Sequence, residues 1–123
     1  MTEFTAIAER YIAAFNETDP TARKERVAAL FAGDATYTDP LADVAGHDGI
    51  DGFLDAAQQQ LAGFTFRLAG DVDGHHRQAR FRWVAGPAGV ADEDAPVVGF
   101  DVIVLDGDGR IRSVHGFLDA VPA

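Results

Sequence analysis

Apolar residues recur at helical spacing in three segments of the first half of the chain. Spacings of three and four residues place such side chains on one face of an amphipathic helix. In residues 3–16 this face comprises Phe4, Ile7, Ala8, Tyr11, Ile12 and Phe15. The pattern therefore predicts a first helix over residues 3–16.

Two further helices are indicated by their capping residues. Asp19 is a natural N-cap with Pro20 at the first helical position, which predicts a helix that runs to about Ala32 and ends at Gly33. Its buried side is formed by Val27, Leu30 and Phe31. The third helix is expected to start at a cap, Asp48, and to stop at Gly63. Its apolar face comprises Ile50, Phe53, Leu54, Ala57 and Leu61.

After the second helix, and again after the third, the period changes to two, which is typical of strands. The stretch DATYTDP predicts a short strand with Ala35, Tyr37 and Asp39 on one face, ended by Pro40. Four more strands are expected, joined by turns at DVDGHH, PAGVADEDAP and DGDG, over residues 64–70, 77–86, 96–106 and 110–119. We expect one α+β domain, residues 1–123, with three N-terminal helices on one face of a curved antiparallel meander.

The excess of acidic over basic residues makes some classes of binding partner unfavourable. Among the 123 residues, 20 Asp and Glu stand against 10 Lys and Arg, which gives a formal net charge of −10. Nucleic acid or an anionic membrane surface would be repelled by this charge. We therefore expect neither nucleic acid nor membrane as a partner.

The chain has no cysteine, which excludes disulfides and thiolate chemistry and favours the cytoplasm. The first residues, MTEFTAIAERY, lack the basic and apolar regions of a signal peptide. No stretch approaches the roughly 20 apolar residues that a membrane span needs. These features predict a cytoplasmic location.

Asp101 stands inside a nearly continuous apolar run, VVGFDVIVL. Such a run is typical of a strand that is covered on both faces. A buried carboxyl group needs a hydrogen-bond partner or a raised pKa, and either property makes it a candidate for a functional site. The alternative is an edge-strand residue that faces solvent or pairs with Arg82.

Tyr11 and Asp39 are further candidates. Tyr11 lies on the apolar face of the first helix, so its hydroxyl group should be buried and hydrogen-bonded, and a purely structural role is the alternative. Asp39 precedes Pro40, where an Asp is an ordinary turn former. Tyr37 shares its strand face.

Metal sites are poorly supported. DGDGR resembles the start of a calcium loop, but the twelfth position holds Phe117 where a Glu is required. His75 and His76 are adjacent, so their side chains point apart, and no third ligand is evident. We expect no metal ion and no cofactor.

Several motifs together resemble the nuclear-transport-factor-2-like superfamily, and within it the ketosteroid-isomerase-like and SnoaL-like groups. The motifs are GDATYTDP, GHDGIDGF and GFDVIVLDGDGRI, in the order helix, helix, strand, helix, meander. The resemblance implies a cone-shaped fold, in which a strongly curved sheet encloses an apolar cavity. It also implies a homodimer.

The resemblance to steroid isomerases assigns roles to the three candidates. Tyr11 in ERYIAAF matches the Tyr that donates a hydrogen bond to the substrate carbonyl oxygen. Asp39 before Pro40 matches the general base, and Asp101 in FDVIV matches the protonated acid that joins the Tyr as a donor. Where the isomerases carry supporting tyrosines on the second and third helices, this chain has Phe31 and Leu54.

A small hydrophobic molecule with a carbonyl group is the expected ligand. Besides Tyr37, Phe31 and Leu54, inward parity predicts a cavity lined by Phe66, Phe81, Trp83, Ile103, Val114 and Leu118. Polyketide cyclisation, dehydration and epoxide hydrolysis are alternative reactions on the same scaffold. Epoxide hydrolysis would need Arg80 or Arg82 inside, whereas alternation places both outside. A non-catalytic ligand-binding or dimerisation module is the alternative from a different class.

Overall fold

The structure, a computed structural model, describes residues 3–122. Within them the helices are α1 (Phe4–Asn16), α2 (Pro20–Leu30), α3 (Gly46–Gln60) and the short 3₁₀ helix η1 (Asp92–Asp94). The strands are β1 (Phe31–Asp39), β2 (Ala42–Ala45), β3 (Phe64–Leu68), β4 (Asp73–His75), β5 (Gln78–Pro87), β6 (Val97–Leu105) and β7 (Ile111–Ala120). None of the helices in this part of the chain is long and apolar enough to cross a membrane.

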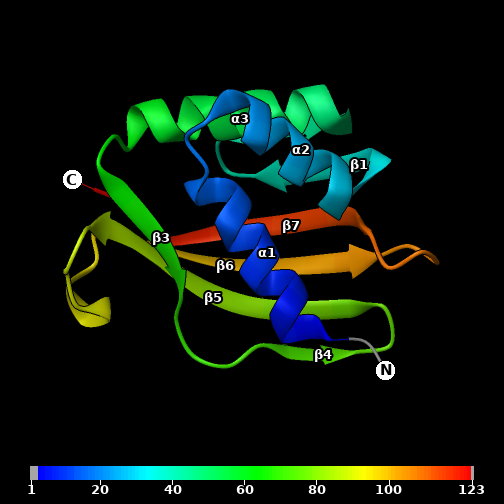
Figure 1. Ribbon diagram of the computed structural model, residues 1–123. Helices are drawn as coiled ribbons and strands as arrows, with labels where there is room; N and C mark the ends of the chain where they lie inside the picture. The colour runs from blue at the N-terminus through cyan, green and yellow to red at the C-terminus, as the bar shows by residue number, and fades with distance from the viewer. Residues whose placement is uncertain (1–2, 123) are drawn as a thin grey trace.

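The strands form one seven-stranded sheet (Figure 1). Its order is β2-β1-β7-β6-β5-β3, and β4 pairs with β5 off this path. β1 runs parallel to β7, and all other pairings are antiparallel. The predicted meander over the later strands is therefore confirmed, and β1 adds one parallel pairing to it.

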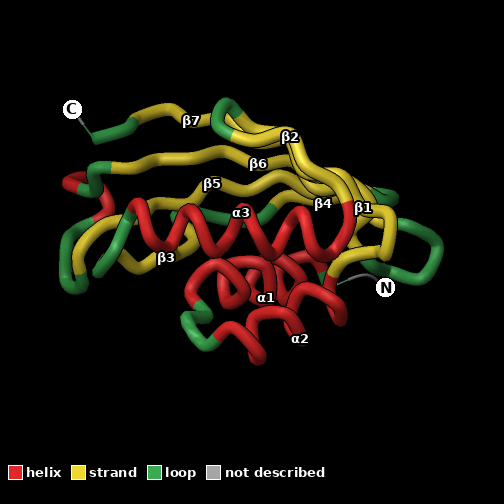
Figure 2. Tube along the Cα trace, turned by 90° about the horizontal axis from the view of Figure 1, so that it is seen from above, coloured by secondary structure: helices red, strands yellow, loops and turns green. Residues whose placement is uncertain are grey.

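All three long helices lie on one side of the sheet. Figure 2 shows the sheet bent around them, with the helices on its concave side. α1 crosses over the central strands, and α3 runs along the side where β1 lies (Figure 1). This arrangement is the α+β, cone-shaped architecture that the sequence predicted.

Burial alternates with a period of two along residues 78–83 of β5 and residues 99–105 of β6, as expected where one face of a sheet is covered. In β5, Phe81 and Trp83 face the helices, whereas Arg80 and Arg82 are exposed. In β6, Asp101 shares the inward face with Ile103 and is 2% exposed. The alternative of a solvent-facing Asp101, or one paired with Arg82, is therefore excluded.

The second helix is shorter than predicted. α2 ends at Leu30, and Phe31 already has extended backbone and pairs with Ile111 of β7. Phe31 is thus buried as the first residue of a strand, because pairing with β7 prevails over its helical spacing from Val27. The prediction that the helix runs to Ala32 and ends at Gly33 was wrong.

The third helix also begins differently from the prediction. Its N-cap is Ala45, without a side-chain hydrogen bond, and Asp48 lies in the first turn. An acidic residue there is favourable because the helix N-terminus carries partial positive charge. The helix ends at Gln60, and Gly63 follows with a φ of +84°, a conformation that glycine adopts without strain.

Two short strands were not predicted. β2 has four residues with little apolar alternation, and β4 lies in a segment, DVDGHH, that was interpreted as a turn. Strands this short carry too few residues to show a period of two. β2 matters for the site because its hairpin with β1 positions Asp39.

The end of α1 is fixed to the edge strand β3 by the Asn16 side chain, which makes the two hydrogen bonds that a neighbouring strand would make. The Asn16 amide donates to the Phe66 carbonyl oxygen at 2.8 Å and accepts from the Phe66 N–H at 2.8 Å. These bonds satisfy backbone groups that an edge strand leaves unpaired. They hold Phe66, and the strand beneath it, close to α1.

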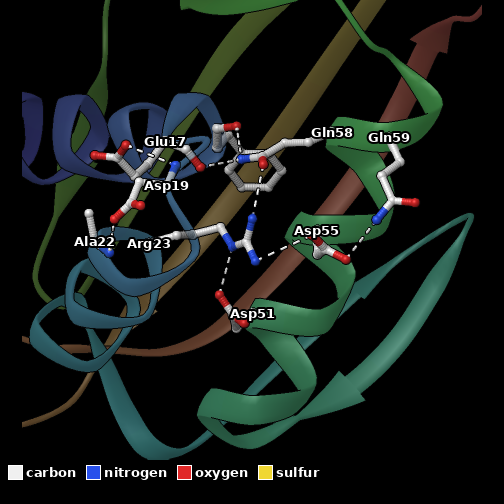
Figure 3. Close-up of polar contacts among 9 residues, drawn as sticks. Glu17, Asp19, Ala22, Arg23, Asp51, Asp55, Gln58 and Gln59 are labelled. Carbon is white, nitrogen blue, oxygen red and sulfur yellow. Dashed lines mark hydrogen bonds and ion pairs between the residues drawn. The ribbon is translucent and has the colours of Figure 1, made fainter.

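A buried guanidinium group joins α2 to α3 (Figure 3). Arg23, 3% exposed, donates to Asp51 at 2.7 Å and to Gln58 at 3.0 Å, and lies 3.4 Å from Asp55. Gln58 in turn donates to the carbonyl oxygens of Phe15 and Glu17 at the end of α1. One cluster thereby connects the three long helices.

Candidate active site

A cavity of about 450 Å³ opens between the helices and one end of the sheet. We call it the apolar cavity. Most of its wall is carbon: the lining residues are Phe15, Tyr37, Asp39, Leu41, Phe53, Ala57, Gln60, Leu61, Phe66, Trp83, Val97, Leu118, Val121 and Pro122. Such a wall with few polar groups is typical of sites for small hydrophobic molecules.

Tyr37 and Asp39 form the main polar part of this wall. Both point inward from β1, and the Tyr37 hydroxyl group donates to Oδ2 of Asp39 at 2.7 Å. Tyr37 is 3% exposed and packs against Phe53, with ring centroids 4.8 Å apart. The shared strand face that alternation predicted is therefore present, and it brings a hydroxyl and a carboxyl group together.

The other oxygen of Asp39 organises the turn between β1 and β2. Oδ1 accepts the backbone N–H groups of Leu41 at 2.8 Å and Ala42 at 2.9 Å. Asp39 is thus the turn former that an Asp before Pro40 suggests. Its carboxylate is also oriented by this turn, with Oδ2 left for Tyr37 and for the cavity.

Behind this wall lies a second pair, Tyr11 and Asp101. The Tyr11 hydroxyl group donates to Oδ2 of Asp101 at 2.6 Å, and both residues are almost fully buried, at 1% and 2% exposed. Neither residue is part of the cavity wall. The buried Tyr hydroxyl and the buried carboxyl group are therefore each other's partners.

Gly116 of β7 lies between the side chains of Asp101 and Asp39. It pairs with Asp101 on β6 and follows His115, which pairs with Thr38 on β1. A Cβ atom on Gly116 would lie 2.9 Å from Oδ1 of Asp101 and 3.1 Å from Cβ of Asp39. A larger residue would therefore push the pair apart.

The protonation of Asp101, Tyr11 and Tyr37 differs from that in water. Burial raises the pKa of Asp101 to about 6 and the Asp39 carboxylate adds to this, while the Tyr11 hydroxyl and the nearby indole N–H of Trp83 oppose it. Burial, and then the charge of Asp101, raises the pKa of Tyr11 and Tyr37 well above the ordinary value. Both tyrosines are hydrogen-bond donors at neutral pH.

The other residues predicted to bind a ligand fall into two groups. Tyr37, Phe66, Trp83 and Leu118 line the apolar cavity. The remaining five are buried in the core and do not line it: Phe31, Leu54, Phe81, Ile103 and Val114. Phe81 packs edge-on against Tyr11 at 5.3 Å, so it supports the cluster from behind.

Sequence reasoning missed several wall residues. Phe15 and Phe53 lie on helical faces that were interpreted as core, and only the position of the cavity separates the two roles. Leu41 and Val121 are 75% and 59% exposed at the rim. Leu41 follows the end of β1 and Val121 follows the end of β7, so neither belongs to a periodic pattern that would predict its position.

Removing the charge of Asp101 is expected to stabilise the protein above pH 6. Its pKa is about 6 when folded and near 4 when unfolded. Between these values the folded state binds more protons than the unfolded state, so stability falls as pH rises, by about 3 kcal/mol in total. Asp101→Asn should abolish this fall, which urea unfolding between pH 4 and pH 8 measures.

Asp34→Asn is the matched control, because Asp34 is exposed and keeps its contact with water in both states. It should retain the wild-type pH dependence. A stability that still falls between pH 4 and pH 6 in Asp101→Asn would contradict a raised pKa at this position.

Within residues 3–122, no group of three or more His, Asp or Glu side chains is arranged to hold a metal ion. His75 lies at the end of β4 and His76 follows it. β4 pairs with β5, which is separated from β1 and Asp39 by β7 and β6, and neither histidine lines the apolar cavity.

The bent sheet, the three covering helices and the paired acids beside an apolar cavity define a protein of the nuclear-transport-factor-2-like class. Within this class the chain belongs to the SnoaL-like family, because residues 8–114 match the model of the SnoaL-like domain. No curated protein matches the sequence.

One solved structure agrees with this assignment, and two more distant ones share the fold. A SnoaL-like family protein from Agrobacterium tumefaciens str. C58, described as a proposed isomerase, is 39% identical, with a TM-score of 0.90 over 98% of this chain and 100% of that one. A proposed polyketide cyclase from Sinorhizobium meliloti is 22% identical (TM-score 0.68; 93% and 94% covered). A protein with a ketosteroid isomerase-like fold from Catenulispora acidiphila, solved with trimethylamine, is 22% identical (TM-score 0.69; 89% and 82% covered).

Proposed function

We propose that the protein catalyses proton transfer on a small hydrophobic substrate that carries a carbonyl group, in the manner of a ketosteroid isomerase. The observation that carries the proposal is the pair of acids around Gly116. One acid, Asp39, faces an apolar cavity, and the other, Asp101, is buried beside it with a pKa raised to about 6. Two acids in different environments suit the separate roles of base and hydrogen-bond donor.

Asp39 is the base in this proposal. Its Oδ2 would take a proton from the carbon next to the carbonyl group. The electrons of the C–H bond would form a carbon–carbon double bond, and the π electrons of the carbonyl group would move to its oxygen as an enolate forms. Return of the proton to another carbon would complete the isomerisation. Tyr37, which donates to Oδ2 at 2.7 Å, would hold the carboxylate in position.

Tyr11 and Asp101 lie behind the cavity wall, so they would stabilise the enolate oxygen of a ligand that displaces part of this wall and reaches them. An apolar ligand expels water from the cavity and an enolate adds negative charge, and both effects raise the pKa of Asp101 further. A neutral Asp101 can donate a hydrogen bond instead of accepting one from Tyr11. Both groups are held by packing before the reaction starts, which is the condition for electrostatic stabilisation.

Isomerisation of a Δ5-3-ketosteroid to its conjugated Δ4 isomer tests the proposal. We expect ultraviolet absorbance of the conjugated ketone to grow in proportion to the protein concentration. A mock preparation from cells without the protein controls for contaminating activity. Steroid that binds and does not react would contradict the proposed chemistry and leave the second candidate below.

The second candidate is a non-catalytic binding protein for small hydrophobic molecules. The hydrogen bonds of Asp39 favour it, because Leu41, Ala42 and Tyr37 already donate to this carboxylate. Of the roughly four acceptor positions of a carboxylate, only one is left to take a proton from a substrate. Binding of the steroid without turnover is the result that this candidate predicts.

A further inference from the structure

Phe15 is the residue at which the wall of the apolar cavity meets the buried Tyr11. Tyr11 packs against three aromatic rings, with centroid distances of 4.9 Å to Phe15, 5.3 Å to Phe81 and 6.3 Å to Phe31. Of these three rings, Phe15 is the one that lines the cavity. Tyr11 and Phe15 are four residues apart on α1, so their side chains are neighbours on one face of the helix.

The Phe15 ring also packs within the wall itself. Its centroid lies 5.3 Å from that of Phe66 and 6.4 Å from those of Tyr37 and Phe53, all of which line the cavity. Phe15 is 7% exposed. The ring therefore contacts both the cavity and Tyr11, and it closes the cavity on the side of Tyr11.

Other wall residues near the buried pair are engaged in polar contacts. The Tyr37 hydroxyl donates to Asp39 at 2.7 Å. Burial raises the pKa of Asp101 to about 6, and the indole N–H of Trp83 is one of the groups that oppose this rise. The side chain of Phe15 has no polar atom, so packing alone holds it, and packing has no preferred direction. Rotation of its ring therefore breaks no hydrogen bond.

We propose that Phe15 is a specificity-determining residue, because a ligand reaches Tyr11 only by displacing the Phe15 ring. Displacement costs packing free energy, which burial of the rest of the ligand in the cavity offsets. Large apolar ketones bury enough surface to reach Tyr11, and small ketones stay in the outer cavity. This inference rests on the proposed function, since it names the part of the wall that the substrate displaces.

Fluorine NMR of the tyrosines tests the inference. The chain has two tyrosines, so 3-fluorotyrosine labelling gives two signals, which Tyr37→Phe assigns. Tyr37 lines the cavity and reports that the cavity is occupied, whereas Tyr11 reports that a ligand has passed Phe15. The probes are 5α-androstan-3-one and cyclohexanone, which carry the same carbonyl group on four rings and on one ring. Both lack the double bond that isomerisation moves, so binding is measured without turnover.

In the wild-type protein we expect 5α-androstan-3-one to shift both signals and cyclohexanone to shift the Tyr37 signal alone. In Phe15→Ala, which removes the ring, cyclohexanone should shift the Tyr11 signal as well. This variant should also bind 5α-androstan-3-one about tenfold more tightly than wild type, because no displacement opposes binding.

Phe53→Ala is the matched control. Phe53 lines the same wall and packs against Phe15 and Tyr37, whereas the ring that joins Tyr11 to the wall is Phe15. Loss of Phe53 removes an apolar contact with the ligand, so 5α-androstan-3-one should bind about threefold to tenfold more weakly. Cyclohexanone should still leave the Tyr11 signal unchanged. Weaker binding of 5α-androstan-3-one in both variants would make Phe15 an ordinary wall contact and overturn the proposal.

The two signals separate this inference from the proposed function. If both ketones shift the Tyr37 signal alone, in wild type and in Phe15→Ala, the role of Phe15 is overturned and the hydrophobic ligand class stays in place. A shift of the Tyr11 signal by cyclohexanone in wild type has the same consequence. If neither ketone shifts either signal, the ligand class and the role of Phe15 are overturned together. The wild-type measurement stands by itself if Phe15→Ala does not fold.

Discussion

Asp39→Asn is expected to lower turnover of the Δ5-3-ketosteroid by about 10²–10⁴-fold, the usual contribution of a positioned general base. Asn has the shape of Asp, and its Oδ1 can still accept the N–H groups of Leu41 and Ala42 that hold the turn. It has no basic oxygen to take a proton. Initial rates of absorbance change at saturating substrate measure the effect.

Asp43→Asn is the matched control for this loss. Asp43 is an exposed carboxylate on the neighbouring strand β2, where it accepts from Thr38 at 3.1 Å, and it does not line the apolar cavity. Its replacement should leave the rate within about twofold of wild type. Equal losses in the two variants would indicate a general effect of the β1–β2 hairpin and would remove Asp39 from the role of base.

Arg23→Met is expected to lower the free energy of unfolding by about 3–5 kcal/mol. The guanidinium group is almost inaccessible and holds Asp51, whose side chain is 12% exposed, at 2.7 Å. Without the cation, Asp51 is left as a buried charge with no partner, which is the costly half of breaking a buried ion pair. Chemical denaturation followed by circular dichroism measures the change.

Two further variants test whether the loss comes from the buried ion pair or from removing any Arg of α2. The side chain of Arg26, on the same helix, is 49% exposed and pairs with Glu17 at 3.0 Å. Arg26→Met is therefore expected to lower the free energy of unfolding by less than about 1 kcal/mol. In Arg23→Met the addition of Asp51→Leu should recover much of the stability, because it removes the stranded charge. If Arg23→Met and Arg26→Met lose the same stability, the buried pair has no special importance.

The periodic parts of the chain could be predicted from the sequence. α1, α3 and the strands β3, β5, β6 and β7 were found within a few residues, because each buries one side against a single layer and so shows one period. Asp101 was found because a carboxyl group inside an apolar run needs a partner. Its partner Tyr11 was found by the same reasoning, and their contact at 2.6 Å joins residues 90 positions apart.

The features that were not predicted depend on contacts between distant parts of the chain, which the spacing of apolar residues does not reveal. Phe31 was placed in a helix because its spacing from Val27 fits one, and pairing with Ile111 decided otherwise. Arg23 was overlooked, although it lies four residues before Val27 on the same buried side of α2 and a charge on that side is a signal. The split between cavity wall and core is a matter of three-dimensional shape, so Phe81 and Trp83 look alike in sequence and differ in the structure.

A glycine at the position of Gly116 indicates, in other sequences of the family, the same placement of the two acids Asp39 and Asp101. Any side chain at this position would occupy the space next to Asp101 and Asp39, at 2.9 and 3.1 Å from their atoms. In a family member with both acids and a bulkier residue here, the Asp101 carboxyl group or the Asp39 side chain has to shift from the position it has in this chain. Glycine at this position is therefore a criterion for sorting SnoaL-like sequences: those that have it together with both acids are the ones to screen first for the same chemistry.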